Sequence, residues 1–210
     1  MDPINLLLGI NLVSTFIMGV SVAKQGIRQK VSTVQERPNS FLQKYPPNLA
    51  AILILVVIAG LFGAGTFSSG SYIVEKTLTL FGLNNVENSV IYFRTGGLVL
   101  YILASWLQIK SVKDLGKNYS QDMVILKKHE LVKKGTFKLI RHPQYLFQIL
   151  MDLGAGIALL SYIIIPVVVL IELPLLILRA SAEEKLLQKY FSDEFINYKK
   201  ESGFFIPFLG

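Results

Sequence analysis

Hydrophobic residues in this chain gather into long runs rather than into the short patterns typical of a soluble protein. Three runs cover residues 4–23, 48–67 and 89–109, and each has about the twenty residues that one helix needs to cross a bilayer. A fourth run, residues 146–178, is too long for one crossing and long enough for two helices that turn near residues 161–166. The pattern predicts five transmembrane helices, the last two forming a helical hairpin.

The segment after the last run has apolar residues at helical spacing. They recur three and four residues apart at Leu187, Phe191, Phe195 and Tyr198. On a helix they form one stripe, so the pattern predicts an amphipathic C-terminal helix that follows the last span. The fold class expected is therefore an all-α integral membrane protein.

Composition supports a single membrane domain, residues 1–210. Hydrophobic residues make up 52% of the chain and charged residues 17%, and the mean hydropathy is positive. The net charge is +7, but the cations stand beside apolar runs, where they suit anionic lipid headgroups better than nucleic acid. We expect no nucleic-acid partner. The absence of cysteine excludes disulfides, thiolate nucleophiles and cysteine-ligated zinc.

The cations also predict an orientation in the membrane. Loops 24–47 and 110–141 and the C-terminal tail are basic, whereas loop 68–88 is nearly neutral. Basic loops face the cytoplasm in membrane proteins. An odd number of spans then places the N-terminus outside and the C-terminus in the cytoplasm.

A polar segment, residues 129–145, holds both histidines between apolar runs. Pro143 suits the first turn of a helix, which puts His142 near the N-cap, where unpaired backbone N–H groups can meet a ligand carboxylate. Gly135 permits a turn or a close backbone approach. Two histidines without helical spacing and without cysteine give little support to a metal site, and we predict none.

Charged residues form two further candidate sites. Arg179 and Glu183 are four residues apart, so they share one helix face at the membrane boundary, and Glu184 points about 100° away. Taken alone, this pair also fits a surface ion pair. Asp152 and Glu172 would lie at similar depth inside the hairpin, where carboxylates are costly and usually functional. They would either meet a polar element of a substrate or stabilise helix packing by a hydrogen bond.

Two blocks of residues carry a resemblance. The first is His129-x-Leu131-Val132-x-x-Gly135-x-Phe137 followed by Arg141-His142-Pro143-x-Tyr145. The second is Arg179-x-x-x-Glu183-Glu184 with Phe191, Glu194, Phe195 and Tyr198. Together they resemble the isoprenylcysteine carboxyl methyltransferase family, within a wider group that includes the membrane phospholipid methyltransferases. The resemblance covers about the second half of the chain.

The resemblance implies a methyltransferase that uses S-adenosylmethionine in a cytosolic pocket joined to the bilayer by a lipophilic tunnel. It implies cofactor contacts by His129, Leu131, Val132, Gly135, Phe137, His142, Tyr145 and Glu184. Arg179 and Glu183 would be the catalytic pair. Residues 1–109 would be a three-span N-terminal part, and residues 110–210 the cofactor-binding and catalytic part. The family more often has tyrosine at Phe137, whose hydroxyl is absent here, and glycine at Ser192.

The expected chemistry needs few groups. Methyl transfer from a sulfonium to a carboxylate neutralises opposite charges, so a dry site favours it. The carboxylate is already ionised at neutral pH and needs no base. Arg179 would align it with a bidentate contact while Glu183 orients the arginine. An amine or thiol acceptor would instead require Glu183 as a base.

The acceptor expected from the resemblance is the carboxylate of an isoprenylcysteine-like lipid. A phospholipid, amine or thiol methyltransferase of the same fold is an alternative, and an NADPH-binding membrane reductase or a non-catalytic scaffold is a different class. The expected partners are the lipid bilayer and the lipophilic acceptor, with no obligate protein partner. The membrane would be the cell membrane in a prokaryote or the endoplasmic reticulum in a eukaryote.

Overall fold

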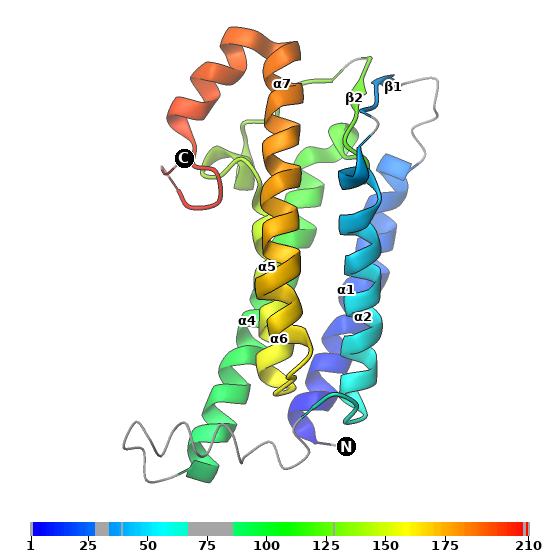
Figure 1. The fold of residues 1–210 in the computed structure, drawn as a ribbon, viewed down its shortest axis with the longest axis vertical. Helices are drawn as coiled ribbons and strands as arrows, with labels where there is room; N and C mark the ends of the chain where they lie inside the picture. Colours follow the sequence, from blue (N-terminus) through cyan, green and yellow to red (C-terminus); the bar gives the residue numbers. More distant parts are fainter. Residues whose placement is uncertain are drawn as a thin grey trace.

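The computed structural model describes residues 2–27, 34–38, 40–66, 86–127, 129–207 and 209, and this part of the chain is mostly helical (Figure 1). The helices are α1 (Pro3–Ile27), α2 (Tyr45–Leu61), α4 (Val86–Leu115), α5 (Pro143–Ala158), α6 (Ile164–Val167) and α7 (Leu173–Glu201). Short 3₁₀ turns cover Phe41–Gln43, Gly116–Asn118 and Gly135–Lys138. Two strands, β1 (Val34–Glu36) and β2 (Ile125–Leu126), pair antiparallel.

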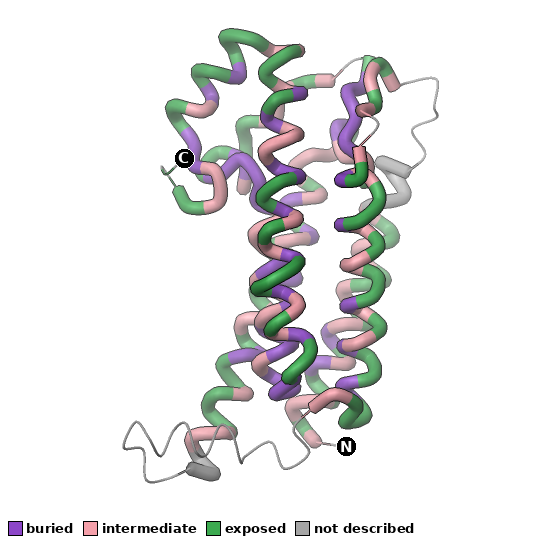
Figure 2. Tube along the Cα trace, viewed as in Figure 1, coloured by how far each residue is buried: buried purple, intermediate pink, exposed green. Residues whose placement is uncertain are grey.

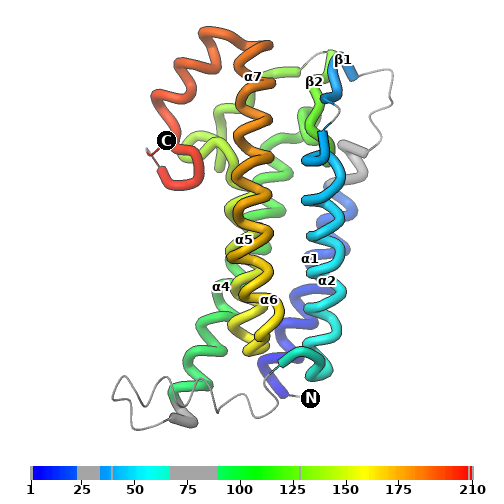
Figure 3. Tube along the Cα trace, in the orientation of Figure 1, coloured from blue at the N-terminus to red at the C-terminus, as the bar shows by residue number. Residues whose placement is uncertain are grey.

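The long helices run side by side in alternating directions (Figure 1). In this view α1 and α2 lie on one side and α4, α5, α6 and α7 on the other. The N-terminus is at one end, and the strands and the second half of α7 are at the opposite end. Figure 3 shows the early strand β1 beside the much later β2 at that end. The loops that were predicted to lie on one side of the membrane therefore gather at one end of the helices. Residues 28–33 and most of the predicted neutral loop lie outside the described residues.

Among the described residues, four helical segments are long and apolar enough to cross a membrane: Pro3–Val22, Phe41–Leu61, Ser89–Asn118 and Ile164–Glu201. The chain is thus a multi-pass integral membrane protein, as predicted. The predicted five spans are not all supported, because α5 has 16 residues and extends about 24 Å, less than the roughly 30 Å of a hydrocarbon core. It is short because it ends at Ala158, ahead of the predicted turn.

The chain reverses after α5, where the hairpin was expected. Ser161 Oγ accepts hydrogen bonds from the backbone N–H groups of Ile163 and Ile164, at 3.3 and 3.1 Å. These bonds satisfy backbone donors at the start of α6. A π-helical turn, Val168–Glu172, then joins α6 to α7.

The residues predicted to form a separate amphipathic helix instead continue α7, and the helix bends at Ser192 (φ 41°, ψ −116°). Phe195 and Tyr198 of the predicted stripe are buried after the bend, whereas Ser192 is exposed. A positive φ is strained for serine and easy for glycine. This bend gives a physical reason for the glycine that the resemblance leads one to expect at position 192.

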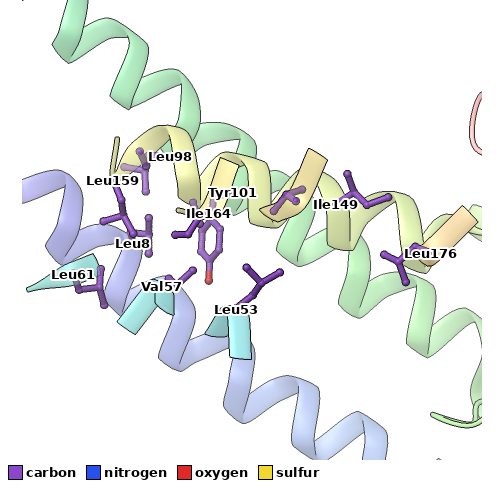
Figure 4. Close-up of a cluster of buried hydrophobic side chains, with 13 residues drawn as sticks. Leu8, Leu53, Val57, Leu61, Leu98, Tyr101, Ile149, Leu159, Ile164 and Leu176 are labelled. Atoms are coloured by element: carbon purple, nitrogen blue, oxygen red, sulfur yellow. The ribbon is translucent and has the colours of Figure 1, made fainter. Parts of the chain in front are cut away.

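The hydrophobic core lies between the two groups of helices. Figure 4 shows Tyr101 of α4 among Leu8, Leu53, Val57 and Ile164. The outward helix faces are exposed (Figure 2) and carry many large apolar side chains, such as Ile17 and Leu170. Exposed apolar faces of this kind suit contact with lipid.

Glycines let α4 and α5 approach closely. A Cβ added to Gly154 would lie 2.6 Å from the backbone nitrogen of Tyr101. A Cβ added to Gly97 would lie 2.6 Å from the backbone nitrogen of Ala158. Backbone atoms cannot move away as a flexible side chain does, so this crossing requires glycine.

We expect Gly154→Ala to lower the free energy of unfolding by about 1–3 kcal/mol, because the added methyl group forces the two helices apart. Denaturant titration of the purified protein in detergent measures this loss. Gly96→Ala in α4 is the matched control, since a Cβ there meets nothing within 4 Å. Equal stability of the two variants would contradict the close packing.

Candidate functional site

The start of α5 is built as the sequence predicted. His142 is the N-cap residue and Pro143 occupies the first turn. The N–H of His142 donates to the carbonyl oxygen of Phe204 at 3.3 Å, and its carbonyl accepts from Leu146 at 3.2 Å. His142, Pro143 and Tyr145 all line a cavity, so the N-terminal end of α5 faces a space that a ligand can enter.

Gly135 makes both the turn and the close approach that were predicted. Its φ is +62°, and a Cβ there would lie 2.2 Å from Oδ2 of Asp114. The same oxygen accepts hydrogen bonds from the backbone N–H and the hydroxyl of Thr136, at 2.8 and 3.0 Å. Gly135 therefore fixes the loop against α4. It does not line the cavity, although it was predicted to contact a cofactor.

A cavity of about 130 Å³ lies beside the N-terminal end of α5. Its apolar wall includes Met123, Val124, Ile125, Leu186, Leu187 and Phe195. Its polar wall includes Asn118, Asp122, Glu130, Arg141 and Glu183. The predicted cofactor residues that line it are His129, Leu131, Val132, Phe137, His142 and Tyr145. We call this space the polar cavity.

A much larger cavity of about 890 Å³ lies between α1 and α2 on one side and α4, α5 and α7 on the other. Its wall is mostly apolar and includes Val13, Phe16, Ile54, Leu55, Ile109 and Leu176. We call it the apolar cavity. Arg179 lines it, and Ser120, Gln144 and Tyr145 line both cavities. The two spaces therefore meet at the first turn of α5.

Arg179, Tyr145 and Glu183 form a hydrogen-bonded set at this junction. Arg179 Nε donates to the hydroxyl of Tyr145 at 2.9 Å and lies 3.5 Å from Oε1 of Glu183. The Tyr145 hydroxyl donates to Oε1 of Glu183, and Arg179 Nη2 donates to the carbonyl oxygen of Gln121. Arg179 is only 4% exposed. The predicted catalytic pair is thus brought together, with Tyr145 between its members.

Glu184, which was predicted to contact the cofactor, pairs with two cations. Its Oε1 is 2.6 Å from Arg141 Nε, and its Oε2 is 2.7 Å from Lys199 Nζ. Glu184 does not line the polar cavity, whereas Arg141 does. Its side chain points about one helix step away from Glu183, toward the second half of α7, and the carboxylate holds Arg141 in place.

The C-terminal segment closes over this ion pair. The N–H of Arg141 donates to the carbonyl oxygen of Gly203 at 2.8 Å. The N–H of Gly203 donates to the carbonyl oxygen of Leu139 at 3.0 Å. The rings of Phe204 and Phe205 lie 5.0 and 6.3 Å from the ring of His142. Residues 202–205 therefore support the back of His142.

Some site residues were missed from the sequence. Arg141 stands inside a recognised motif, which was a usable signal, but it received no role. Asp122 and Asn118 gave no signal because they precede the motif in a loop of irregular structure. Gln121 contributes a main-chain oxygen to Arg179, which no side-chain pattern reveals.

His129 lies partly buried against α7, with its ring 5.8 Å from that of Phe191. Burial lowers the pKa of His129 below its ordinary value of 6.5. The unfolded chain therefore binds this proton at a higher pH than the folded chain does, so acidification favours unfolding.

We expect the free energy of unfolding to fall as the pH drops below about 6.5, with part of that fall due to His129. His129→Gln removes the titrating group, so its stability should depend less on pH between about 7 and 5. Unfolding curves at several pH values measure the difference. Parallel curves for the two proteins would contradict the buried neutral imidazole.

The described residues include no group of three or more His, Cys, Asp or Glu side chains that could hold a metal ion.

Comparison with known proteins gives matches in the second half of the chain. Residues 97–189 match the model of the isoprenylcysteine carboxyl methyltransferase (ICMT) family. A protein-S-isoprenylcysteine O-methyltransferase of Saccharomyces cerevisiae is 30% identical over 115 residues, which are 54% of this chain and 48% of that protein. One of Tribolium castaneum is 28% identical over 115 residues, 54% of this chain and 41% of that protein. The chain thus matches about half the length of these curated relatives.

A solved structure described as the eukaryotic intramembrane Ras methyltransferase ICMT matches the whole chain and covers 69% of that protein, with a TM-score of 0.62 and 19% identity. At this identity the match shows the fold. The matched family segment contains α5, both sequence blocks up to Lys189, and the junction of the two cavities. The resemblance predicted from the sequence is therefore confirmed, and through residues 97–189 the chain is related to the isoprenylcysteine carboxyl methyltransferase family.

Proposed function

We propose that this protein transfers a methyl group from S-adenosylmethionine to the carboxylate of an isoprenylcysteine-like lipophilic acceptor. The observation that carries this proposal is the junction of a polar and an apolar cavity at Tyr145. A polar, nucleoside-bearing donor suits the first space and a hydrocarbon chain suits the second. The names of the two curated relatives support the same reaction and acceptor.

The polar cavity has groups that fit the cofactor. Apolar side chains such as Val132 and Leu187 would pack on an adenine ring, and the carboxylates of Asp122 and Glu183 suit ribose hydroxyls and a positive sulfonium. The first-turn N–H groups of α5 suit the carboxylate of the methionine part. Nε2 of buried His142 lies 3.4 Å from Oε1 of Glu184, and its Nδ1 lies 3.8 Å from Oε2 of Glu183, so two carboxylates hold the ring in the cavity wall.

When bound, S-adenosylmethionine supplies an electrophilic methyl group. Arg179 lines the acceptor side and carries the charge that an acceptor carboxylate requires. Its Nε and Nη2 are already engaged by Tyr145 and Gln121, which leaves Nη1 for the acceptor. This geometry supports a contact through Nη1 rather than the bidentate contact expected from the sequence.

Glu183 has the position of an orienting group. It accepts the Tyr145 hydroxyl and lies beside Arg179 Nε, and it lines the donor cavity rather than the acceptor cavity. In this position Glu183 keeps Arg179 aligned and adds negative charge near the sulfonium. A base for an amine or thiol acceptor would need to face the apolar cavity, so the geometry favours a carboxylate acceptor.

The proposal extends to topology. We infer that α5 is a fifth, shorter membrane segment, since it lies antiparallel beside α4 among the longer spans (Figure 1). The end with the polar cavity then faces the cytoplasm and the N-terminus lies outside. Residues 1–109 contribute most of the acceptor cavity wall, which α5 and α7 complete with residues such as Gln148 and Arg179, and residues 110–210 contribute the donor cavity and the junction.

The test is transfer of a radiolabelled methyl group from S-adenosylmethionine to prenylcysteine, phospholipid and thiol acceptors. We expect a base-labile methyl ester on the prenylcysteine acceptor. Binding of NADPH without binding of S-adenosylmethionine would overturn the proposal in favour of a reductase, and binding of neither would favour a scaffold. Labelling of the amine or thiol acceptors alone would reassign Glu183 as a base.

A further inference from the structure

A carboxylate bound beside Arg179 needs more than one hydrogen-bond donor. Nη1 of Arg179 supplies one, because Tyr145 and the carbonyl oxygen of Gln121 engage Nε and Nη2. A carboxylate has two oxygens that together accept about four hydrogen bonds. The wall of the apolar cavity is mostly apolar, and a charge without partners in such surroundings costs free energy. A second donor close to Arg179 is therefore expected.

Several polar side chains in the wall of the apolar cavity are already hydrogen-bonded. The Ser105 hydroxyl donates to a backbone carbonyl oxygen within α4 at 2.8 Å, and Gln148 Nε2 donates to Oε1 of Glu172 at 2.7 Å. The Tyr145 hydroxyl donates to Glu183. These groups have spent the hydrogen that a ligand anion would need.

Tyr119 is a polar side chain near Arg179 that has not. It stands two residues before Gln121, whose carbonyl oxygen accepts from Arg179. It lines the apolar cavity but not the polar one, whereas Ser120 and Gln144 line both. Within the described residues the Tyr119 hydroxyl makes no hydrogen bond and is not enclosed. It is therefore accessible to a ligand on the acceptor side alone.

The phenol of Tyr119 has the right charge state to donate. Burial raises the pKa of Tyr119 above its ordinary value of 10.0, and the positive charge of Arg179 acts in the opposite direction. The phenol is thus neutral at physiological pH, and it lies close enough to the guanidinium for the two groups to interact. A hydrogen bond from such a donor to a carboxylate is about twice as strong as one between neutral groups.

We propose that Tyr119 is an acceptor-binding residue whose hydroxyl donates a hydrogen bond to the acceptor carboxylate, together with Nη1 of Arg179. This inference rests on the proposed function, which places that carboxylate beside Arg179. The phenol holds the oxygen that does not react. The other oxygen forms the bond to the methyl carbon while the electron pair of the broken carbon–sulfur bond goes to sulfur. No proton moves, so Tyr119 remains a donor throughout.

Tyr119→Phe should raise KM for N-acetyl-S-farnesylcysteine about tenfold and leave kcat within about threefold of its original value. The carboxylate carries its full charge in the bound acceptor and less in the transition state, so losing this hydrogen bond weakens binding more than transfer. Transfer of a radiolabelled methyl group by the full chain in nanodiscs measures both constants. Calorimetry should show an unchanged affinity for S-adenosylmethionine, because Tyr119 does not line the polar cavity.

Tyr92→Phe is the matched control for Tyr119. It removes the same hydroxyl from a residue of α4 that is 74% exposed and lines neither cavity, so KM should stay unchanged. An unchanged KM in Tyr119→Phe would overturn the inference. A parallel loss of S-adenosylmethionine affinity would also overturn it, because Tyr119 would then support the fold rather than the acceptor.

Binding without the cofactor separates this inference from the proposed reaction. Tritiated N-acetyl-S-farnesylcysteine and its carboxamide carry the same lipid, but only the first carries a charge. Tyr119→Phe should weaken binding of the acid about tenfold and of the amide by about threefold or less, measured by scintillation proximity. Equal weakening of both would overturn the inference. A preference for the acid that depends on Tyr119, without any methyl ester, would support the inference and count against the proposed reaction.

Discussion

Arg179→Ala is expected to lower the rate of methyl transfer by about 100- to 1,000-fold, the range seen when one aligned charge-stabilising donor is removed from an active site. The affinity for S-adenosylmethionine should change little, because Arg179 lines the apolar cavity and not the polar one. Single-turnover transfer from radiolabelled cofactor measures the rate, and calorimetry measures the affinity.

Lys185→Ala is the matched control for Arg179, since Lys185 is exposed on the same helix and should lose neither rate nor affinity. Arg179→Lys keeps the charge but loses the fork that holds Tyr145 and the carbonyl of Gln121 together. We expect it to recover only a small part of the rate. A loss of cofactor affinity equal to the loss of rate would reassign Arg179 to the donor cavity.

The transmembrane part of the fold could be predicted because it depends on long apolar runs. The runs around residues 4–23, 48–67 and 89–109 all appear as helices α1, α2 and α4. The 146–178 run was harder, because its hydropathy does not show where a helix stops. The turn that ends α5 at Ala158 depends on Ser161 and on backbone hydrogen bonds, and it shortened the segment that was expected to span.

The site could be predicted in part. The positions of His142 and Gly135 follow from local rules, since proline begins helices and glycine permits a positive φ. The ion pair of Glu184 with Arg141 depends on tertiary packing across 43 residues, which no spacing rule gives. For the same reason, the sequence could place Arg179 beside Glu183 but could not place Tyr145 between them.

Two sets of hydrogen-bonded and charged residues have different expected roles in the site. Glu183, Tyr145 and Arg179 lie at the junction, where small displacements change the alignment of the reacting groups. Glu184 and Lys199 lie behind the polar cavity, and Glu184 holds Arg141 in the cavity wall, which ties α7 to the loop before α5. Changes in the first set should therefore affect rate, whereas changes in the second should affect stability and cofactor affinity together.

Glu184→Gln is the sharpest test of this separation. Removing the carboxylate leaves the charge of Arg141 buried without its partner, since Arg141 is 5% exposed, and breaking a buried pair in this way costs about 3–5 kcal/mol. We expect a loss of that size in the free energy of unfolding in detergent. Affinity for S-adenosylmethionine should fall as well, because Arg141 and His142 line the polar cavity.

Glu194→Gln provides the comparison on the same helix. Glu194 pairs with Lys133 at 2.8 Å with both side chains well exposed, and exposed pairs contribute about 0–1 kcal/mol. Equal losses in the two variants would show that the Glu184 pair does not support the fold. A loss of cofactor affinity in Glu184→Gln without a loss of stability would instead support the direct cofactor contact that the sequence predicted for Glu184.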